Sequence, residues 1–379
     1  MDLTLSEEQQ MLQRSARDFL ERACPTTKVR ALREPSSSGH DPELFQQMGE
    51  LGWLGLPFSE QYGGGGATLF ELGLIYEEAG RALVPTSLYS TVEAALLLDA
   101  LGSEAQKEGW LPAMVAGQRV STLAASEPQA IHDPRFWKTQ AQKQGSHWIL
   151  HGRKVFVRNA HLAEPLFVVA RTGSGAVPSS LTVFAVSPQA EGCLLESQET
   201  FGKDRQSLVS LDGVEVEEDE IVGGKAAIGR SWEALVHLNE QTTALQCLEM
   251  VGGAQRVLEM TVDHVRTREQ FGRPIGSFQA VQHHVANMAI AVDGARLASY
   301  QALWRVANDL SATREVAIAK AWSGEAYKQV TVMAHQLFGG MGYVKETDLH
   351  LWSERAKAAE LFLGARDNQL QRLAKAMGL

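Results

Sequence analysis

Apolar residues recur at helical spacing through the first third of this chain. The run from Ser6 to Gln9 is a capping-box pattern, and the apolar positions between Leu12 and Leu20 follow it at helical intervals. Asp41 and Pro42 read as an N-cap followed by a first-turn proline. Residues 69–83 and 90–101 are two further apolar runs, so this part of the chain is predicted to be helical.

Short β-rich runs replace the helical pattern in the middle of the chain. They cover residues 148–157, 166–170, 181–186 and 208–216, and Gly, Ser, Asn and Asp separate them. Several such strands in series predict a small antiparallel barrel or sandwich.

Helical periodicity returns near residue 226 and continues to the end. Four long helices are expected, at residues 234–268, 277–310, 314–338 and 346–377. A length of 379 residues also suggests two or three structural units. The predicted fold is therefore α+β and multidomain. It has an N-terminal α-helical domain (1–118), a middle β-barrel or sandwich domain (119–228) and a C-terminal four-helix bundle (229–379).

Charge and cysteine content narrow the class of protein. The formal charge of −10 and the absence of any Lys/Arg tract argue against nucleic acid or an anionic membrane as main partner. Cys24, Cys193 and Cys247 are too widely spaced to indicate a metal site or a disulfide framework, and are expected to be reduced thiols. The N-terminus lacks the charged and apolar regions of a signal peptide, and no apolar run approaches the ~20 residues of a membrane span. We expect a cytoplasmic protein without a metal ion.

One long segment carries the most specific motif. Residues 266–283 read RTREQFGRPIGSFQAVQH. This segment resembles the second signature of the acyl-CoA dehydrogenase family. Residues 252–256 (GGAQR), 336–343 (QLFGGMGY) and 51–65, which contain LGWLGLP and YGGG, resemble other parts of that family, so the resemblance spans the whole chain.

The matched residues suit a dinucleotide. The guanidinium of Arg268 can contact a diphosphate in bidentate geometry, and the glutamines can hydrogen-bond ribose or adenine edges. Glycines without a Cβ let the backbone approach a ligand closely. The resemblance implies that this set holds the pyrophosphate and adenosine end of FAD, partly across a subunit boundary. The residues are Arg268, Gln270, Phe271, Gln279, Gln336, Gly339 and Gly340.

The middle domain matches the family less well. Residues 125–129 read ASEPQ, where the family has Thr-Glu-Pro-Gly and then x-Gly-Ser. The resemblance implies that Ser126 offers its hydroxyl to the flavin ring. Residues 154–159 (KVFVRN) resemble Lys-x-Trp-Ile-Thr-Asn, so Phe156 would keep an aromatic face against the isoalloxazine. Arg158 stands where the family usually has a hydroxyl side chain. It is interpreted as an ordinary arginine exposed on a strand.

The family's catalytic glutamate is missing from both of its known positions. Leu363 stands at the C-terminal position, in a run from Arg355 to Gly364 that otherwise resembles the family. The second position, on the helix that leads into Arg268, is Thr242. Neither leucine nor threonine replaces a carboxylate as a general base.

Four other acids are candidates for the base. Glu249 shares a helix face with Thr242 at i+7, about 10 Å along the axis, and is alternatively a buried acid paired with Arg256. Glu240 lies two residues before Thr242, where it could alternatively stabilise the helix start or contact CoA. The other two acids are Glu360, which is alternatively a surface acid, and Asp367. A base supplied by a partner chain is the remaining alternative.

The resemblance implies a function. It is FAD-dependent α,β-dehydrogenation of an acyl-CoA thioester to a trans-2-enoyl-CoA, with electrons passed to an electron-transfer flavoprotein, as in β-oxidation of fatty acids or steroid side chains. A homotetramer or heterotetramer, built as a dimer of dimers, is expected. One alternative is a non-catalytic or half-site subunit of an α2β2 enzyme, as in divergent bacterial members resembling steroid side-chain enzymes, paired with a second chain of the same family. The other is a flavin-dependent monooxygenase or oxidase on the same fold.

Overall fold

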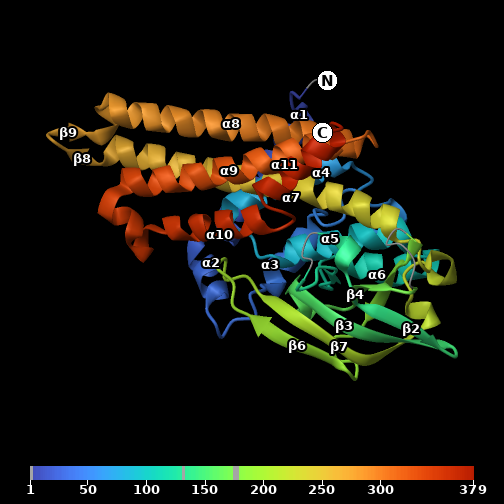
Figure 1. Cartoon of the computed structure of the whole chain (residues 1–379). Helices are drawn as coiled ribbons and strands as arrows, with labels where there is room; N and C mark the ends of the chain where they lie inside the picture. The colour runs from blue at the N-terminus through green and yellow to red at the C-terminus, as the bar shows by residue number, and fades with distance from the viewer. Residues whose placement is uncertain (1–2, 130–132, 174–178) are drawn as a thin grey trace. The chain divides into compact units, whose positions relative to one another are not determined.

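The computed structural model describes residues 3–129, 133–173 and 179–379, and it divides into two compact units (Figure 1). The first unit comprises Met1–Ala31, Thr68–Val84 and Glu240–Leu379. The second comprises Leu32–Ala67 and Pro85–Asn239. The predicted fold class is confirmed, with helices, then a sheet, then a helical bundle along the chain. The boundaries 1–118, 119–228 and 229–379 stay predictions.

The first unit is helical. Its helices are α1 (Glu7–Ala23), α2 (Thr26–Arg33), α4 (Leu69–Ala82), α7 (Trp232–Thr267), α8 (Gln279–Ala307), α9 (Thr313–Phe338), α10 (Leu349–Leu361) and α11 (Arg366–Ala376); α2 and α7 also reach into the second unit. The expected capping box of α1 is present at Ser6 and Gln9. Helices α8, α10 and α11 pack against α9. A short hairpin, β8 (Glu269–Gln270) and β9 (Arg273–Pro274), joins α7 to α8 at one end of the bundle (Figure 1).

The fourth long helix predicted for the C-terminus is wrong in one respect, because it is broken into α10 and α11. The break falls at Leu363 and Gly364, whose φ angles are 58° and 96°. A left-handed residue ends a helix, and glycine adopts this conformation without steric cost. The chain therefore turns at the position where the family resemblance expects the catalytic glutamate.

Helices α4 and α7 approach each other at glycines. A Cβ on Gly252 would lie 1.7 Å from the carbonyl oxygen of Glu77, and one on Gly80 would lie 1.9 Å from that of Glu249. Only residues without a side chain permit this backbone contact. The contact fixes the middle of α7, which carries Glu249.

The second unit combines helices with a seven-stranded sheet. The helices are α3 (Pro42–Glu50), α5 (Ser87–Leu101) and α6 (Glu104–Val115). The strands are β1 (Thr122–Ala124), β2 (Gln140–Gln144), β3 (His147–Arg158), β4 (Leu166–Arg171), β5 (Leu181–Val186), β6 (Cys193–Gln198) and β7 (Gln206–Glu217). Their order is β1-β4-β2-β3-β7-β6, with β5 paired to β4. The purely antiparallel pairing that the strand series suggested is wrong, because β4 pairs in parallel with both β1 and β2.

Within the described ranges, no helix is long and apolar enough to cross a membrane.

Candidate active site

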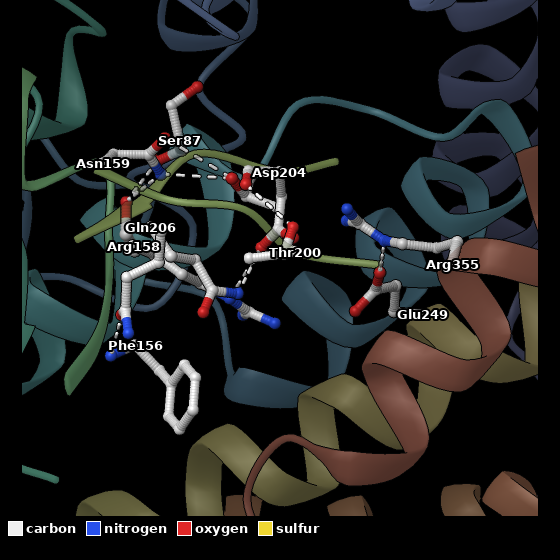
Figure 2. Close-up of polar contacts among 12 residues, drawn as sticks. Ser87, Phe156, Arg158, Asn159, Thr200, Asp204, Gln206, Glu249 and Arg355 are labelled. Carbon is white, nitrogen blue, oxygen red and sulfur yellow. Dashed lines mark hydrogen bonds and ion pairs between the residues drawn. The ribbon is translucent and has the colours of Figure 1, made fainter. Parts of the chain in front are cut away.

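The carboxylate of Glu249 is buried in the interior of the first unit. Its residue is 2% exposed, and Arg355 of α10 donates from Nε to Oε1 at 2.6 Å (Figure 2). The expected pairing with Arg256 is wrong. Arg256 lies two helical turns from Glu249, about 10 Å along the axis, and its guanidinium is 3.9 Å from Glu259 instead.

Arg355 engages only one oxygen of this carboxylate. Its Nη2 is directed instead to the backbone carbonyl of Val84, at 3.5 Å. Oε2 of Glu249 accepts no hydrogen bond from any residue that the structure describes. The carboxylate is therefore held in place through Oε1 while Oε2 keeps its capacity to take a proton.

The second candidate, Glu240, is tied to neighbouring helices. Thr313 of α9 donates from Oγ1 to its Oε1 at 2.5 Å. Burial lowers the pKa of Arg372 on α11, and the nearby charge of Glu240 opposes that shift. Glu240 is half-buried, and its contacts are those of a residue that joins α7 to the bundle.

The acids near the C-terminal position lie in different surroundings. The interpretation of Glu360 as a surface acid is wrong, since the residue is 8% exposed and Lys357 donates to its Oε2 at 2.8 Å. Asp367 is exposed in the first turn of α11. Lys320, buried in α9, donates to the carbonyls of Ala359 and Glu360 at 2.9 Å each and so caps the end of α10.

Leu363 and Thr242 stand at the two positions where the family usually carries its catalytic glutamate. Leu363 lies in the turn between α10 and α11, and Gln369 donates from Nε2 to its carbonyl at 2.8 Å. Thr242 is 9% exposed on α7, one helical turn before Gln246. Neither position offers a carboxylate.

The residues expected at the adenosine end of FAD gather around the β8–β9 hairpin and the end of α9. Gln270 lies in β8, and Phe271 follows at the tip with φ 57° and an exposed fraction of 91%. Arg268 and Gln279 flank the hairpin and are exposed. Exposed donors on both sides of an exposed aromatic ring suit a phosphate and a ribose–adenine group.

The glycine turn after α9 is open on its outer side. Gln336 is exposed in the last turn of α9, and Gly339 ends the helix with φ 60°. A Cβ on Gly339 or Gly340 would meet no described atom within 4 Å. His335 holds this turn to α10, with Nδ1 2.8 Å from the carbonyl of Gly342 and Nε2 2.6 Å from Ser353 Oγ. The turn leaves backbone accessible to a ligand, so the glycines also fit a dinucleotide.

The structure brings together the two residues expected at the flavin ring. The backbone N–H of Val155 donates to the carbonyl of Ser126 at 2.9 Å, next to Phe156. Phe156 lies in an irregularity of the β3–β7 ladder with φ 56°, and it is 40% exposed. Its N–H donates to the side chain of Gln198 at 2.9 Å. An accessible aromatic ring beside a serine fits a planar heterocycle.

Three family models match the chain. The acyl-CoA dehydrogenase N-terminal domain matches residues 6–118, the middle domain residues 122–214 and the C-terminal domain residues 232–378.

The chain belongs to the acyl-CoA dehydrogenase family.

Proteins of known identity are similar to this chain over almost its whole length. Mitochondrial isovaleryl-CoA dehydrogenase of Pongo abelii is 31% identical over 380 residues, which span 97% of this chain and 88% of the relative. A chain of the ChsE4–ChsE5 complex from Mycobacterium tuberculosis is 30% identical with a TM-score of 0.89, over 100% of this chain and 99% of that one. The FAD complex of PigA is 25% identical with a TM-score of 0.91, over the full length of both chains.

Sequence reasoning missed a buried ion pair in the segment that carries Ser126. Lys154 is 0% exposed and donates from Nζ to Glu127 Oε1 at 2.8 Å and to the carbonyl of Ala125 at 3.0 Å. Glu127 also accepts from the backbone N–H groups of residues 138 and 139. The pair therefore fixes the loop that carries Ser126. The sequence contained an indication of this ion pair, because Lys154 and Glu127 both lie in segments that resemble the family.

Burial and the attraction between the two charges act in opposite directions on the pKa of Lys154 and on that of Glu127. Burial lowers the pKa of Lys154 to about 8, against the attraction of Glu127. Burial acts to raise the pKa of Glu127, but Lys154 and the backbone N–H groups outweigh it and hold that pKa below its ordinary value. The pair is thus a folding constraint on the candidate flavin site.

Arg158 is buried, so its interpretation as an exposed strand arginine is wrong. The residue is 8% exposed, and its Nε lies 3.9 Å from Oδ2 of Asp204 (Figure 2). Asp204 accepts from Thr200 at 2.8 Å and from Gln206 at 2.6 Å. Burial raises the pKa of Glu93 to about 7, while Arg158 opposes that shift. Arg158 thus belongs to an interior charge cluster of the second unit.

Proposed function

We propose that this chain catalyses the α,β-dehydrogenation of an acyl-CoA thioester, with FAD as cofactor and Glu249 as the base. The observation that carries the proposal is the buried carboxylate of Glu249, which is held through Oε1 and has no described partner at Oε2. A general base works when one oxygen is positioned and the other is within reach of the proton. Glu240 is the weaker candidate because it is only half-buried, whereas Glu249 is 2% exposed and so lies away from water.

The chain's residues divide the work. Oε2 of Glu249 removes the proton from Cα, and the electron pair left behind forms the Cα–Cβ double bond. FAD, when bound, supplies the acceptor for the hydride that leaves Cβ. Arg268, Gln270, Gln279 and the glycine turn hold the adenosine end, whereas Ser126 and Phe156 orient the flavin ring. The exposure of the hairpin residues and the openness of the turn support this assignment.

We further propose that the electrons pass to an electron-transfer flavoprotein, as the family membership suggests. A tetramer with a second family chain is the alternative assembly, and similarity to the ChsE4–ChsE5 complex favours it. In that case this chain is a half-site subunit, and Leu363 and Thr242 are the residues that favour such a role.

Anaerobic titration of the flavin with short, long, branched and steroid acyl-CoA thioesters tests the proposal. Glu249→Gln preserves shape and hydrogen bonding, and we expect it to slow flavin reduction about 10²–10⁴-fold while the bound flavin spectrum is unchanged. Glu240→Gln is the matched control on the same helix, and is expected to reduce at nearly the wild-type rate. Wild-type reduction in both variants refutes Glu249 as the base.

Co-expression distinguishes catalysis by this chain alone from the alternative in which it is a half-site subunit. The chain is purified alone and together with a neighbouring homologue. Flavin that binds and is reduced only in the co-expressed complex, with no effect of Glu249→Gln, assigns the base to the partner. Reduction by the chain alone that depends on Glu249 excludes a purely structural subunit.

A further inference from the structure

Three polar side chains form a ridge along the buried part of α7. Thr243, Gln246 and Glu249 are spaced three residues apart and are 0%, 4% and 2% exposed. Residues at i and i+3 on a helix are neighbours, with about 4.5 Å of axial rise between them. Apolar residues fill the rest of this stretch, including Ala244, Leu245, Leu248 and Met250. We call Thr243, Gln246 and Glu249 the polar ridge.

Two members of the polar ridge lack partners. Neither Nε2 nor Oε1 of Gln246 has a hydrogen-bond partner among the described residues, and the same holds for Oγ1 of Thr243. About 90% or more of buried polar groups are paired in folded proteins, so an amide with both ends unpaired needs a specific reason. The remaining member, Glu249, is the proposed base.

We infer that Gln246, assisted by Thr243, binds an oxygen substituent on the acyl chain of the substrate. The inference rests on the proposed function, because Glu249 places the reacting Cα beside the polar ridge. Gln246 lies one helical turn from Glu249, so the oxygen that it contacts lies a few bonds along the acyl chain from Cα.

The chemistry of the amide sets the substrate class. Nε2 donates to a keto or hydroxyl oxygen, and Oε1 accepts from a hydroxyl hydrogen. A plain hydrocarbon chain satisfies neither end of the amide. A site built to bind an oxygen atom discriminates against the analogue that lacks it, because its own polar groups are then buried without partners. The chain therefore selects oxygenated acyl-CoA thioesters over saturated hydrocarbon ones.

The test compares octanoyl-CoA with octanoyl-CoA thioesters that carry a keto or a hydroxyl group on the γ, δ or ε carbon. We expect the wild type to give a higher kcat/KM for at least one oxygenated thioester than for octanoyl-CoA. Gln246→Met keeps the size of the side chain but removes both hydrogen-bonding atoms. That variant is expected to lower the preference ratio about 10- to 100-fold. Gln241→Met, a half-buried glutamine on the same helix, is the matched control and leaves the ratio unchanged.

A binding measurement accompanies the rates. The preferred oxygenated thioester is expected to raise the thermal midpoint of the wild type more than octanoyl-CoA does, and Gln246→Met removes that difference. Thr243→Val, which is close to isosteric, is expected to lower the preference in the same direction. It also keeps the inference testable if Gln246→Met does not fold.

Several outcomes overturn the inference while the proposed function stands. They are equal rates for plain and oxygenated thioesters in the wild type, an unchanged ratio in both ridge variants, and an equal loss for every thioester in Gln246→Met. The last result assigns Gln246 to the thioester carbonyl or to packing. If no thioester reduces the flavin or shifts the midpoint of the wild type, the proposed function fails and the inference fails with it.

Discussion

The ion pair between Glu249 and Arg355 leads to a quantitative stability prediction. The change is Arg355→Met, which removes the guanidinium but keeps much of the apolar stem. The two side chains are 3% and 13% exposed, and Nε lies 2.6 Å from Oε1. At that distance and an effective dielectric constant of about 20, the attraction between the two charges is about 6 kcal/mol. In the variant, solvation of the remaining Glu249 charge offsets part of this lost attraction. Breaking a buried pair of this kind costs about 3–5 kcal/mol, since one charge stays buried without a partner.

Urea unfolding followed by circular dichroism measures this loss. We expect Arg355→Met to lower the free energy of unfolding by about 3–5 kcal/mol at neutral pH. The double variant Glu249→Leu/Arg355→Met replaces both charges with apolar groups and is expected to recover most of the loss. Arg266→Met, at an exposed position near the end of α7, is the control and is expected to change stability by less than about 1 kcal/mol.

Two results contradict this reasoning. If Arg355→Met unfolds within about 1 kcal/mol of the wild type, Arg355 does not compensate a buried charge. If the double variant is as unstable as the single one, the loss comes from packing around α10 and not from the charge of Glu249.

Three further predictions concern both units. Gly252→Ala is expected to lower the free energy of unfolding by more than about 4 kcal/mol or to prevent folding, because its Cβ would lie 1.7 Å from a carbonyl oxygen of α4. Gly109→Ala is the control, since its Cβ meets nothing within 4 Å, and it is expected to change the urea midpoint little or to raise it. Burial raises the pKa of Glu93 to about 7 against the pull of Arg158, so its contribution to stability is complete below its ordinary value of 4.5 and is lost as the pH rises through 7. Between pH 4.5 and 8, the thermal midpoint of the wild type is expected to fall relative to that of Glu93→Gln by the equivalent of about 3 kcal/mol, and parallel profiles would contradict this. The pH dependence of stability from Glu127 has the opposite sign, because Lys154 and backbone N–H groups outweigh burial and hold the pKa of Glu127 below 4.5. The stability that Glu127 contributes above pH 4.5 is therefore lost on acidification, and Glu127→Gln is expected to flatten the acid limb of a plot of unfolding free energy against pH.

The fold was largely predictable because its long elements carry strong periodic patterns. Helices such as α7 and α9 present continuous apolar faces, and β4 and β5 are almost entirely buried. The elements that were missed have weak patterns. β1 is only three residues long, and β2 and β6 are polar or partly exposed along their length. Their pairing is decided by long-range contacts that local propensity does not contain.

In the candidate site, the motifs indicated local backbone geometry, and the roles of their residues stay predictions. Phe271 and Gly339 lie at positive φ on exposed turns, which fits the motif that singled them out. The partner of Glu249 was not predictable, because Arg355 is 106 residues away and only the packing of α10 brings it close. Similarly, the turn at Leu363 places a leucine in the left-handed region, where no propensity favours it.

The stability cost of Glu249 bears on whether this chain is catalytic. A buried carboxylate needs a compensating charge, and an apolar pair of similar volume at Glu249 and Arg355 would be as stable or more so. A subunit whose only role is structural gains nothing from such a pair, nor from the unpaired amide of Gln246 one turn away. Both features are costs that a reacting substrate would offset. Together they favour a catalytic chain with a relocated base over one that has lost its base.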